Sequence, residues 1–153
     1  MTWAAIFSIT NMIALIAWLL LILGPRGKTT GAIILYLGVG LLCLAYTVMF
    51  GLLFGGMVDP VRVAGAAGQG SFTSIEGIRA LFMSDGGIVI GWTHYLAFDL
   101  FVGQWIAKDA DHKQVARWVQ APVLLLTFFA GPAGLFLWLL LRERRARRMA
   151  RTA

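Results

Sequence analysis

The sequence predicts an all-α integral membrane protein: a four-helix bundle of membrane-spanning helices with a short interfacial helix in the long second loop. Of the 153 residues, 59% are hydrophobic and only 13% are charged, whereas soluble domains carry about a quarter charged residues. The apolar residues gather into four runs, each close to the roughly 20 residues that a helix needs to cross a bilayer. Because backbone groups cannot stay unpaired in lipid, these runs must be helices. We expect one membrane domain, residues 1–153.

The first two spans are expected over residues 3–23 and 31–54. No basic residue precedes the first run and no small-residue cleavage site follows it, so we expect it to be retained as a helix rather than removed as a signal peptide. The second run contains Gly51 and Gly55. Their spacing of four predicts close packing against another membrane helix.

The connection over residues 55–86 is the longest segment outside the spans. Its first part, residues 63–70, is rich in glycine and predicts a flexible loop. Ser74 then precedes apolar residues at helical spacing, namely Ile75, Ile78, Leu81 and Phe82. This pattern predicts a short amphipathic helix at the membrane interface, with Ser74 as its N-cap.

The third and fourth spans are expected over residues 87–107 and 118–141. The fourth contains Pro122 and, deeper, the segment Gly131-Pro132-Ala133-Gly134. A proline inside a helix removes one backbone hydrogen bond and bends the helix. We therefore expect a kink in the fourth helix, beside the third.

The net charge of +6 comes largely from a basic tail, residues 142–153. A basic cluster directly after an apolar run is typical of a topology anchor beside anionic lipid headgroups, which makes membrane lipid the expected partner and argues against nucleic acid. Four spans put both termini on one side of the membrane. The distribution of Lys and Arg then favours cytoplasmic N- and C-termini.

The third span differs from the others because polar side chains lie within it, above all Asp99 near its middle. A carboxylate at that depth must be paired, protonated or placed in a polar cavity, and is a functional candidate by default. At about 100° per residue, Asp99 shares a face with Tyr95, whereas His94 projects roughly 140° away. We take Asp99, His94 and Tyr95 as candidate catalytic residues. The alternative is that they bond across helices and only fix the bundle.

Aromatic and polar residues around this span are candidate ligand-binding residues: Trp92, Phe98, Gly103, Trp105 and Gln120. No metal or cofactor is expected. Cys43 is the only cysteine, and His112 lies in a polar loop beside Asp109 and Asp111, which we interpret as a solvated turn.

The segment Gly91 to Gly103 resembles the Trp-x-His-x-x-x-x-Asp-Leu core of the neoxanthin synthase-like family, to which the plant abscisic-acid-deficiency membrane protein belongs. The matching residues are Trp92, His94, Asp99 and Leu100. The resemblance continues over about residues 70–142, through Gly70-Ser71, Ile75 to Phe82, Asp109, Pro122 and Gly131 to Gly134. The first two spans agree with the family in pattern only.

The resemblance implies a protein of a bacterial inner membrane that binds or isomerises a carotenoid or related isoprenoid lipid. Plant members are implicated in a non-redox isomerisation of an epoxy-carotenoid to an allenic carotenoid, which needs a base and an acid. On side-chain chemistry, Asp99 is the candidate base and Tyr95 or His94 the candidate acid. Two alternatives stay open, a non-catalytic membrane scaffold and a small proton-coupled carrier, and so does a homo-oligomer.

Overall fold

The structure is a computed structural model that describes residues 2–64 and 70–150, with side chains up to Glu143. The described residues are mostly helical and contain no β-strand, which confirms the all-α class. The helices are α1 (Trp3–Leu23), α2 (Lys28–Ile33), the π-helical segment η1 (Ile34–Gly40), α3 (Leu41–Phe54), α4 (Ile75–Phe82), α5 (Asp85–His112), α6 (Arg117–Phe129) and α7 (Gly131–Ala150). Most of the predicted flexible loop, residues 65–69, and the last three residues of the basic tail lie outside the described part.

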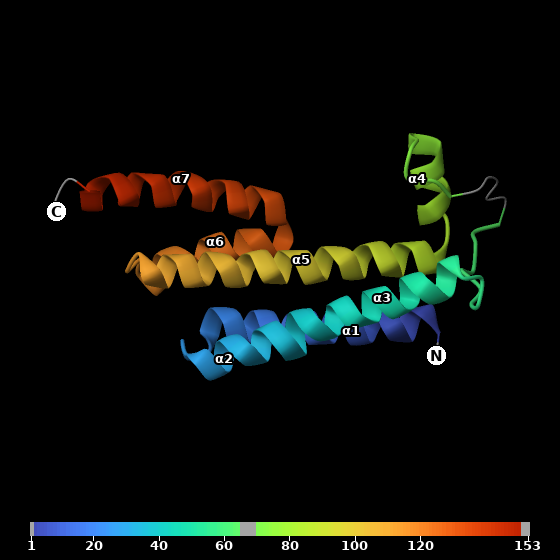
Figure 1. Ribbon diagram of the computed structural model, residues 1–153, viewed down its shortest axis with the longest axis horizontal. Helices are drawn as coiled ribbons and strands as arrows, with labels where there is room; N and C mark the ends of the chain where they lie inside the picture. The colour runs from blue at the N-terminus through green and yellow to red at the C-terminus, as the bar shows by residue number, and fades with distance from the viewer. Residues whose placement is uncertain (1, 65–69, 151–153) are drawn as a thin grey trace.

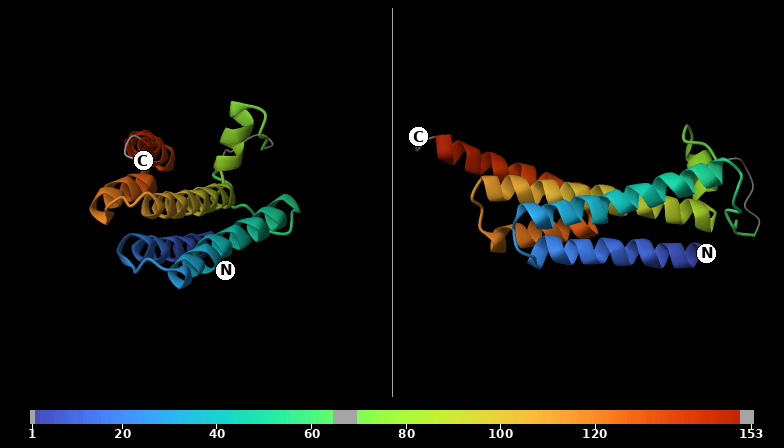
Figure 2. Two further views of the ribbon diagram at one scale, coloured as in Figure 1. Left: turned by 60° about the vertical axis from the view of Figure 1, so that its left-hand side comes forward. Right: turned by 60° about the horizontal axis from the view of Figure 1, so that its bottom comes forward.

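α5 is the central helix of the molecule. It contacts α1, η1, α3, α4, α6 and α7. Figures 1 and 2 show it between a layer formed by α1 and α3 and a second layer that holds α7 and α4. One face of its central turns is fully buried, with Leu100 and Ile106 both at 0% exposure. The third predicted span therefore lies at the centre of the molecule.

Within residues 2–64 and 70–150, two elements are long and apolar enough to cross a membrane. α1 has a mean hydropathy of 2.4, and the continuous helix Lys28–Phe54, formed by α2, η1 and α3, has 2.3. α5 is longer still but does not meet the same test among the described residues, since polar side chains such as Asp99 and Gln104 interrupt it. A bundle of four membrane-spanning helices is thus supported only in part.

The two apolar helices meet at Gly38 rather than at the predicted glycine pair. A Cβ atom at Gly38 would lie 3.0 Å from both Ala17 of α1 and Leu100 of α5. A Cβ at Gly51 would meet nothing within 4 Å. The close helix packing predicted at Gly51 and Gly55 therefore occurs earlier in the chain, at Gly38, where small residues let three helices touch.

The fourth predicted span, residues 118–141, is not one helix. It is divided into α6 and α7 at Ala130, whose backbone leaves the helical region at φ −152° and ψ 74°. Figure 1 shows that α7 does not continue α6 with a kink but runs back beside it, and the two helices pack together. The 13 residues of α6 extend over only about 20 Å at 1.5 Å per residue, less than the roughly 30 Å of a hydrocarbon layer.

This hairpin changes where the chain ends. In Figure 1 the start of α1 and the end of α7 lie toward opposite ends of the long axis. The expectation that both termini lie on one side assumed four full crossings, and the α6–α7 hairpin removes that assumption. We call one end of the molecule the basic end; it contains residues 24–27, residues 113–116 and the end of α7. We call the other end the loop end; it contains Thr2, residues 55–64 and residues 70–84.

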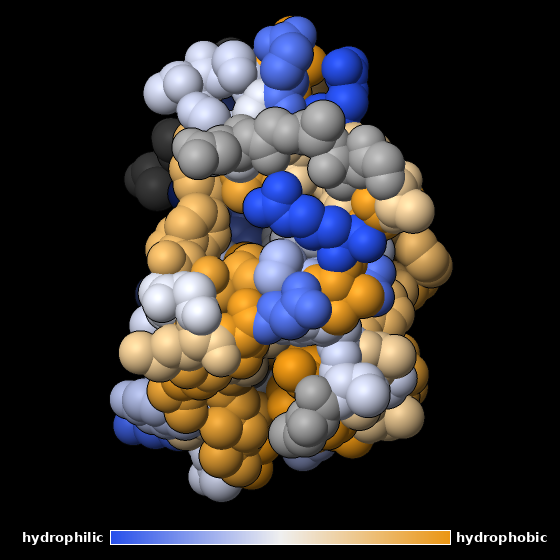
Figure 3. All heavy atoms as spheres, turned by 90° about the vertical axis from the view of Figure 1, so that its right-hand side faces the viewer, coloured by the Kyte–Doolittle hydropathy of each residue, from blue (hydrophilic) through white to orange (hydrophobic). Residues whose placement is uncertain are grey.

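The predicted short helix is present as α4. Its N-cap is Ser74, whose hydroxyl accepts a hydrogen bond from the Gly77 backbone N–H at 3.1 Å. The preceding loop is held against the start of α5 by backbone bonds from Asp85 to Val61 and from Gly86 to Pro60. Seen end-on, the loop end has hydrophilic side chains near its centre and apolar ones on its flanks (Figure 3).

Candidate functional site

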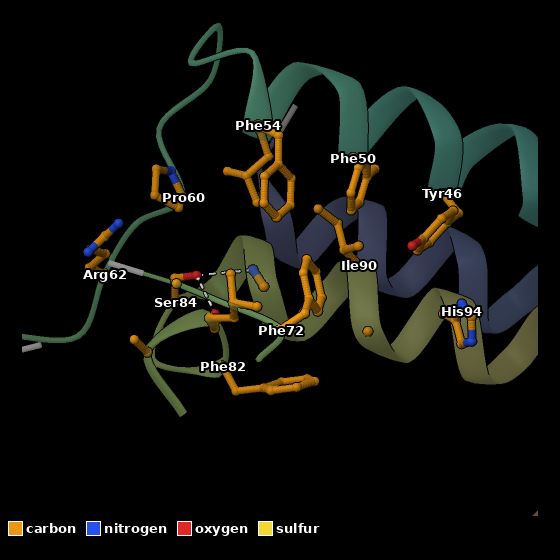
Figure 4. A pocket seen from close by; sticks show the side chains of 16 residues that line it. Tyr46, Phe50, Phe54, Pro60, Arg62, Phe72, Phe82, Ser84, Ile90 and His94 are labelled. Carbon is orange, nitrogen blue, oxygen red and sulfur yellow. Dashed lines mark hydrogen bonds between the residues drawn. The ribbon is translucent and has the colours of Figure 1, made fainter. Parts of the chain in front are cut away.

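A cavity of about 670 Å³ lies at the loop end, between α3, α4 and α5. Aromatic side chains from α3, α4 and the loop line it, and Figure 4 shows them around a common space. They are Tyr46, Phe50, Phe54, Phe72 and Phe82. Ser84 lies beside the cavity with its hydroxyl already engaged, donating to Leu81 O at 3.0 Å and accepting from Gly87 N at 3.1 Å.

The rings form a continuous row along the cavity. Tyr46, Phe50 and Phe54 are four residues apart on α3, so they point to one side of that helix. The ring centroids are 5.7 Å apart between Tyr46 and Phe50 and 4.3 Å apart between Phe50 and Phe54, both in stacked geometry. Phe72 of the loop continues the row, 6.1 Å from Phe54.

His94 of α5 continues the row at its other end. Its imidazole lies 5.5 Å from the Tyr46 ring and stacks at 4.6 Å on Phe98. In Figure 4 His94 and Arg62 lie at opposite ends of the group of lining residues, with Arg62 on the side of the loop. His94 is thus the one residue of the predicted catalytic set that lines this cavity.

Asp99 and Tyr95 lie on another face of α5, at the break between α6 and α7. Asp99 is only 8% exposed. Its carboxylate interacts with the Tyr95 hydroxyl and the Gly131 backbone N–H, and Oδ2 has no hydrogen-bond partner among the described residues. The Tyr95 hydroxyl donates to the Phe128 carbonyl at 3.4 Å. A carboxylate beside the first N–H of α7 is favourably placed against the positive end of that helix.

The predicted catalytic residues therefore do not form one site. Asp99 and Tyr95 make the same-helix pair that helical geometry predicted, and His94 points away from both, into the aromatic cavity. An acid–base pair of His94 and Asp99 acting on one ligand is not available in this arrangement.

The predicted ligand-binding residues are also dispersed. Trp92 is 40% exposed and donates from Nε1 to the Asn11 side chain at 3.0 Å. Phe98 is 56% exposed and touches the row of rings through His94. A Cβ at Gly103 would overlap the Trp18 ring, so this glycine permits close packing on α1.

Trp105 and Gln120 belong to a polar network at the basic end. Gln120 donates to Asp111 at 2.8 Å and accepts from Arg26 at 3.0 Å. These bonds connect the loop of residues 24–27 to α6. The Arg142 guanidinium lies 5.5 Å above the Trp105 ring. These contacts fasten helix ends. A pocket at this end, lined by Arg26 and Asp111 among others, measures about 70 Å³, which is too small for a large ligand.

Asp109 is the centre of this network and fastens α7 to α5. It accepts hydrogen bonds from Lys113 at 2.6 Å, from Arg142 Nε at 2.9 Å and from Trp138 Nε1 at 3.0 Å. Burial acts to raise the pKa of Asp109, but the hydrogen bonds from Lys113, Arg142 and Trp138 outweigh it and hold that pKa below its usual value.

Across the part of the chain that the structure describes, no three side chains of His, Cys, Asp or Glu lie close enough together to hold a metal ion. The residues that sequence reasoning missed are those of the aromatic row. Their signal was present in part, because Tyr46, Phe50 and Phe54 recur every four residues in an otherwise aliphatic run. Nothing local indicated that Phe72 would join them.

Comparison with known proteins gives one match. The model of the ABA DEFICIENT 4-like family matches residues 5–138, most of the chain. This range includes the aromatic row, the Asp99–Gly131 contact and the α6–α7 break. Neither the curated proteins nor the solved structures gave a significant match.

Proposed function

Because the chain belongs to the ABA DEFICIENT 4-like family, we propose that it is a multi-pass membrane protein that binds a carotenoid or related isoprenoid in the aromatic cavity at the loop end. Family membership supports a carotenoid-related role, as the neoxanthin synthase-like resemblance implied. The observation that carries the proposal is the row of stacked rings along the cavity, from Phe72 through Phe54 and Phe50 to Tyr46.

The row suits a long conjugated ligand. A polyene is flat, apolar and polarisable, so it gains dispersion energy along a series of aromatic faces without needing hydrogen bonds. The cavity volume of about 670 Å³ falls within the range of about 300–1,000 Å³ typical of small-molecule pockets. It accommodates an end ring and part of the chain, while the rest of the polyene follows the exposed apolar surface into lipid.

Isomerisation of the bound ligand is a second proposal, favoured by the position of His94. Converting an epoxide to an allene without net redox change needs a base and an acid. The base takes the proton from the chain carbon next to the epoxide, so that the C–H electrons form the new double bond as the C–O bond breaks, and the acid gives a proton to the epoxide oxygen. His94 and the Tyr46 hydroxyl are the groups of this kind beside the cavity. Asp99 faces the α6–α7 break instead, so we assign it no part in that chemistry.

The binding proposal is tested by expressing the protein in a carotenoid-producing host and measuring the pigment that co-purifies in detergent. The wild type is expected to retain pigment at a fixed ratio to protein. The double variant Phe50→Ala/Phe54→Ala is expected to lose most of it, because two adjacent rings of the row are removed. Phe136→Ala, an exposed aromatic of α7, serves as the matched control and is expected to retain pigment.

Wild-type protein without pigment, or equal retention by the double variant and the Phe136→Ala control, would overturn the binding proposal. Isomerisation is read in the same experiment from the chemical identity of the pigment. A pigment that is bound but identical to that of the host without the protein would remove the second proposal and leave the first.

A further inference from the structure

The arrangement of charge along the molecule points to its orientation. α6 runs from the basic end to about the middle of α5, and α7 returns to the basic end (Figure 2). The apolar part of α7, Gly131 to Leu141, extends over only about 16 Å before the first arginine. Neither helix crosses a hydrocarbon layer of roughly 30 Å. α1 and the continuous helix Lys28–Phe54 pass the test for a membrane span, and we treat α5, the 28-residue helix packed against both, as the third crossing.

With three crossings, positive charge is distributed very unevenly. At the loop end, the described Lys and Arg residues are Arg62 and Arg79. All the others lie at the basic end: Arg26, Lys28, Lys108, Lys113, Arg117, Arg142, Arg144, Arg145, Arg147 and Arg148. Lys and Arg in short connections are retained on the cytoplasmic side, and this bias sets the orientation of membrane proteins.

Exposed tryptophan supports a membrane boundary at the basic end. Trp118, at the start of α6, is 80% exposed. Trp105, on the neighbouring helix α5, lies with its ring under the Arg142 guanidinium. Tryptophan with its ring exposed and a basic side chain beside it is typical of the headgroup region. The hairpin tip at Ala130–Gly131 then lies near the middle of the membrane, where non-helical backbone is tolerated because the protein covers it.

We infer that the C-terminal end of α7 lies in the cytoplasm, that the N-terminus lies outside, and that the aromatic cavity therefore opens toward the non-cytoplasmic leaflet. Its wall includes α4 and residues of the loop end. The part concerning the ligand rests on the proposed function: the isoprenoid is taken from, and released into, that outer leaflet. An enzyme acting before or after this protein on the same lipid would have to reach it there.

Cysteine labelling tests this orientation without using any ligand. In a Cys43→Ser background, single cysteines replace Thr73 beside α4, Ala80 on the cavity wall, and His112 at the end of α5. Thr73 and His112 are exposed and Ala80 is half-buried. Intact cells are treated with a membrane-impermeant maleimide, and a second sample is treated after permeabilisation.

Thr73→Cys and Ala80→Cys are expected to be labelled in intact cells, and His112→Cys only after permeabilisation. The reverse pattern, or all three positions reacting only after permeabilisation, would overturn the inference. The labelling reports the topology alone. The inferred orientation can therefore be contradicted while pigment still co-purifies, and pigment can be absent while the labelling pattern supports the orientation. The two proposals therefore fail separately.

Discussion

The carboxylate of Asp99 lies directly against the Cα atom of Gly131, at the point where α6 ends and α7 begins. A Cβ at residue 131 would overlap the Asp99 carboxylate oxygens. The carboxylate also faces the first backbone N–H of α7. A helix N-terminus has unpaired donors and a partial positive charge. We infer that Asp99 supplies the polar contact that the broken backbone needs inside the protein, so its primary role is to position the hairpin.

Gly131→Ala should therefore destabilise the protein. The added methyl group would force the carboxylate or the start of α7 to move, and overpacking of this kind costs about 1–3 kcal/mol. Gly51→Ala is the matched control, because a Cβ there meets nothing within 4 Å and alanine favours a helix by about 1 kcal/mol. Thermal unfolding in detergent should show a lower midpoint for Gly131→Ala and an equal or higher one for Gly51→Ala. Equal midpoints for the two variants would contradict the proposed contact.

Substitutions of Asp99 should affect stability only when no acceptor for the Gly131 N–H remains, and they should leave pigment binding in place. Asp99→Asn retains an acceptor for the Gly131 N–H, so its stability should stay within about 1 kcal/mol of wild type. Asp99→Leu leaves that donor without an acceptor. Its free energy of unfolding should be about 1 kcal/mol lower than that of Asp99→Asn, which is the scale of a polar contact between membrane helices. Unfolding midpoints and pigment-to-protein ratios are measured together. Loss of pigment in Asp99→Asn at unchanged stability would assign Asp99 to the ligand site instead.

The long helices could be predicted from the sequence because their signals are local. Span 3–23 corresponds to α1, and span 31–54 to all but the first three residues of Lys28–Phe54. α5 begins at Asp85, slightly before the predicted residue 87, because the Ser84 hydroxyl caps Gly87 N at 3.1 Å. Apolar length and capping residues fixed these elements without reference to the rest of the fold.

The hairpin and the cavity could not be predicted in the same way. The Gly131-Pro132 pair marks a break, but local sequence cannot distinguish a kink from a reversal, which depends on the packing of α7 against α6 and α5. The cavity depends on a contact between Phe54 and Phe72, eighteen residues apart across a loop. The separation of His94 from Asp99, by contrast, follows from helix geometry, which predicted different faces of the third span for these two residues, and the structure places them so.

Replacing the imidazole of His94 separates binding from chemistry. His94→Phe keeps a flat ring between Tyr46 and Phe98, so stacking at the end of the row is preserved and pigment should be retained. The phenyl ring that replaces the imidazole cannot exchange a proton, so the pair formed with the Tyr46 hydroxyl is incomplete. If the protein isomerises its ligand, the bound pigment should therefore be the unconverted one, as identified by chromatography and absorption. His94→Ala provides the comparison, since it removes both functions and should also reduce pigment retention. Conversion by His94→Phe at the wild-type rate would exclude His94 as the acid–base group.

Acid should weaken the attachment of α7 through Asp109. Because Lys113, Arg142 and Trp138 hold the pKa of Asp109 below its usual value of about 3.9, its contribution to stability is complete above that value. It is lost as the pH falls below about 3.9 through the lower pKa of the folded state, since protonation removes the charge that the three donors require. Asp109→Asn should lower stability by about 1–3 kcal/mol at neutral pH and show a smaller further loss between pH 5 and pH 3. Glu143→Gln, which neutralises an exposed acid next to Arg142, should keep the wild-type pH dependence. If unfolding midpoints measured across this range fall equally in all three proteins, Asp109 does not hold α7 in place through its charge.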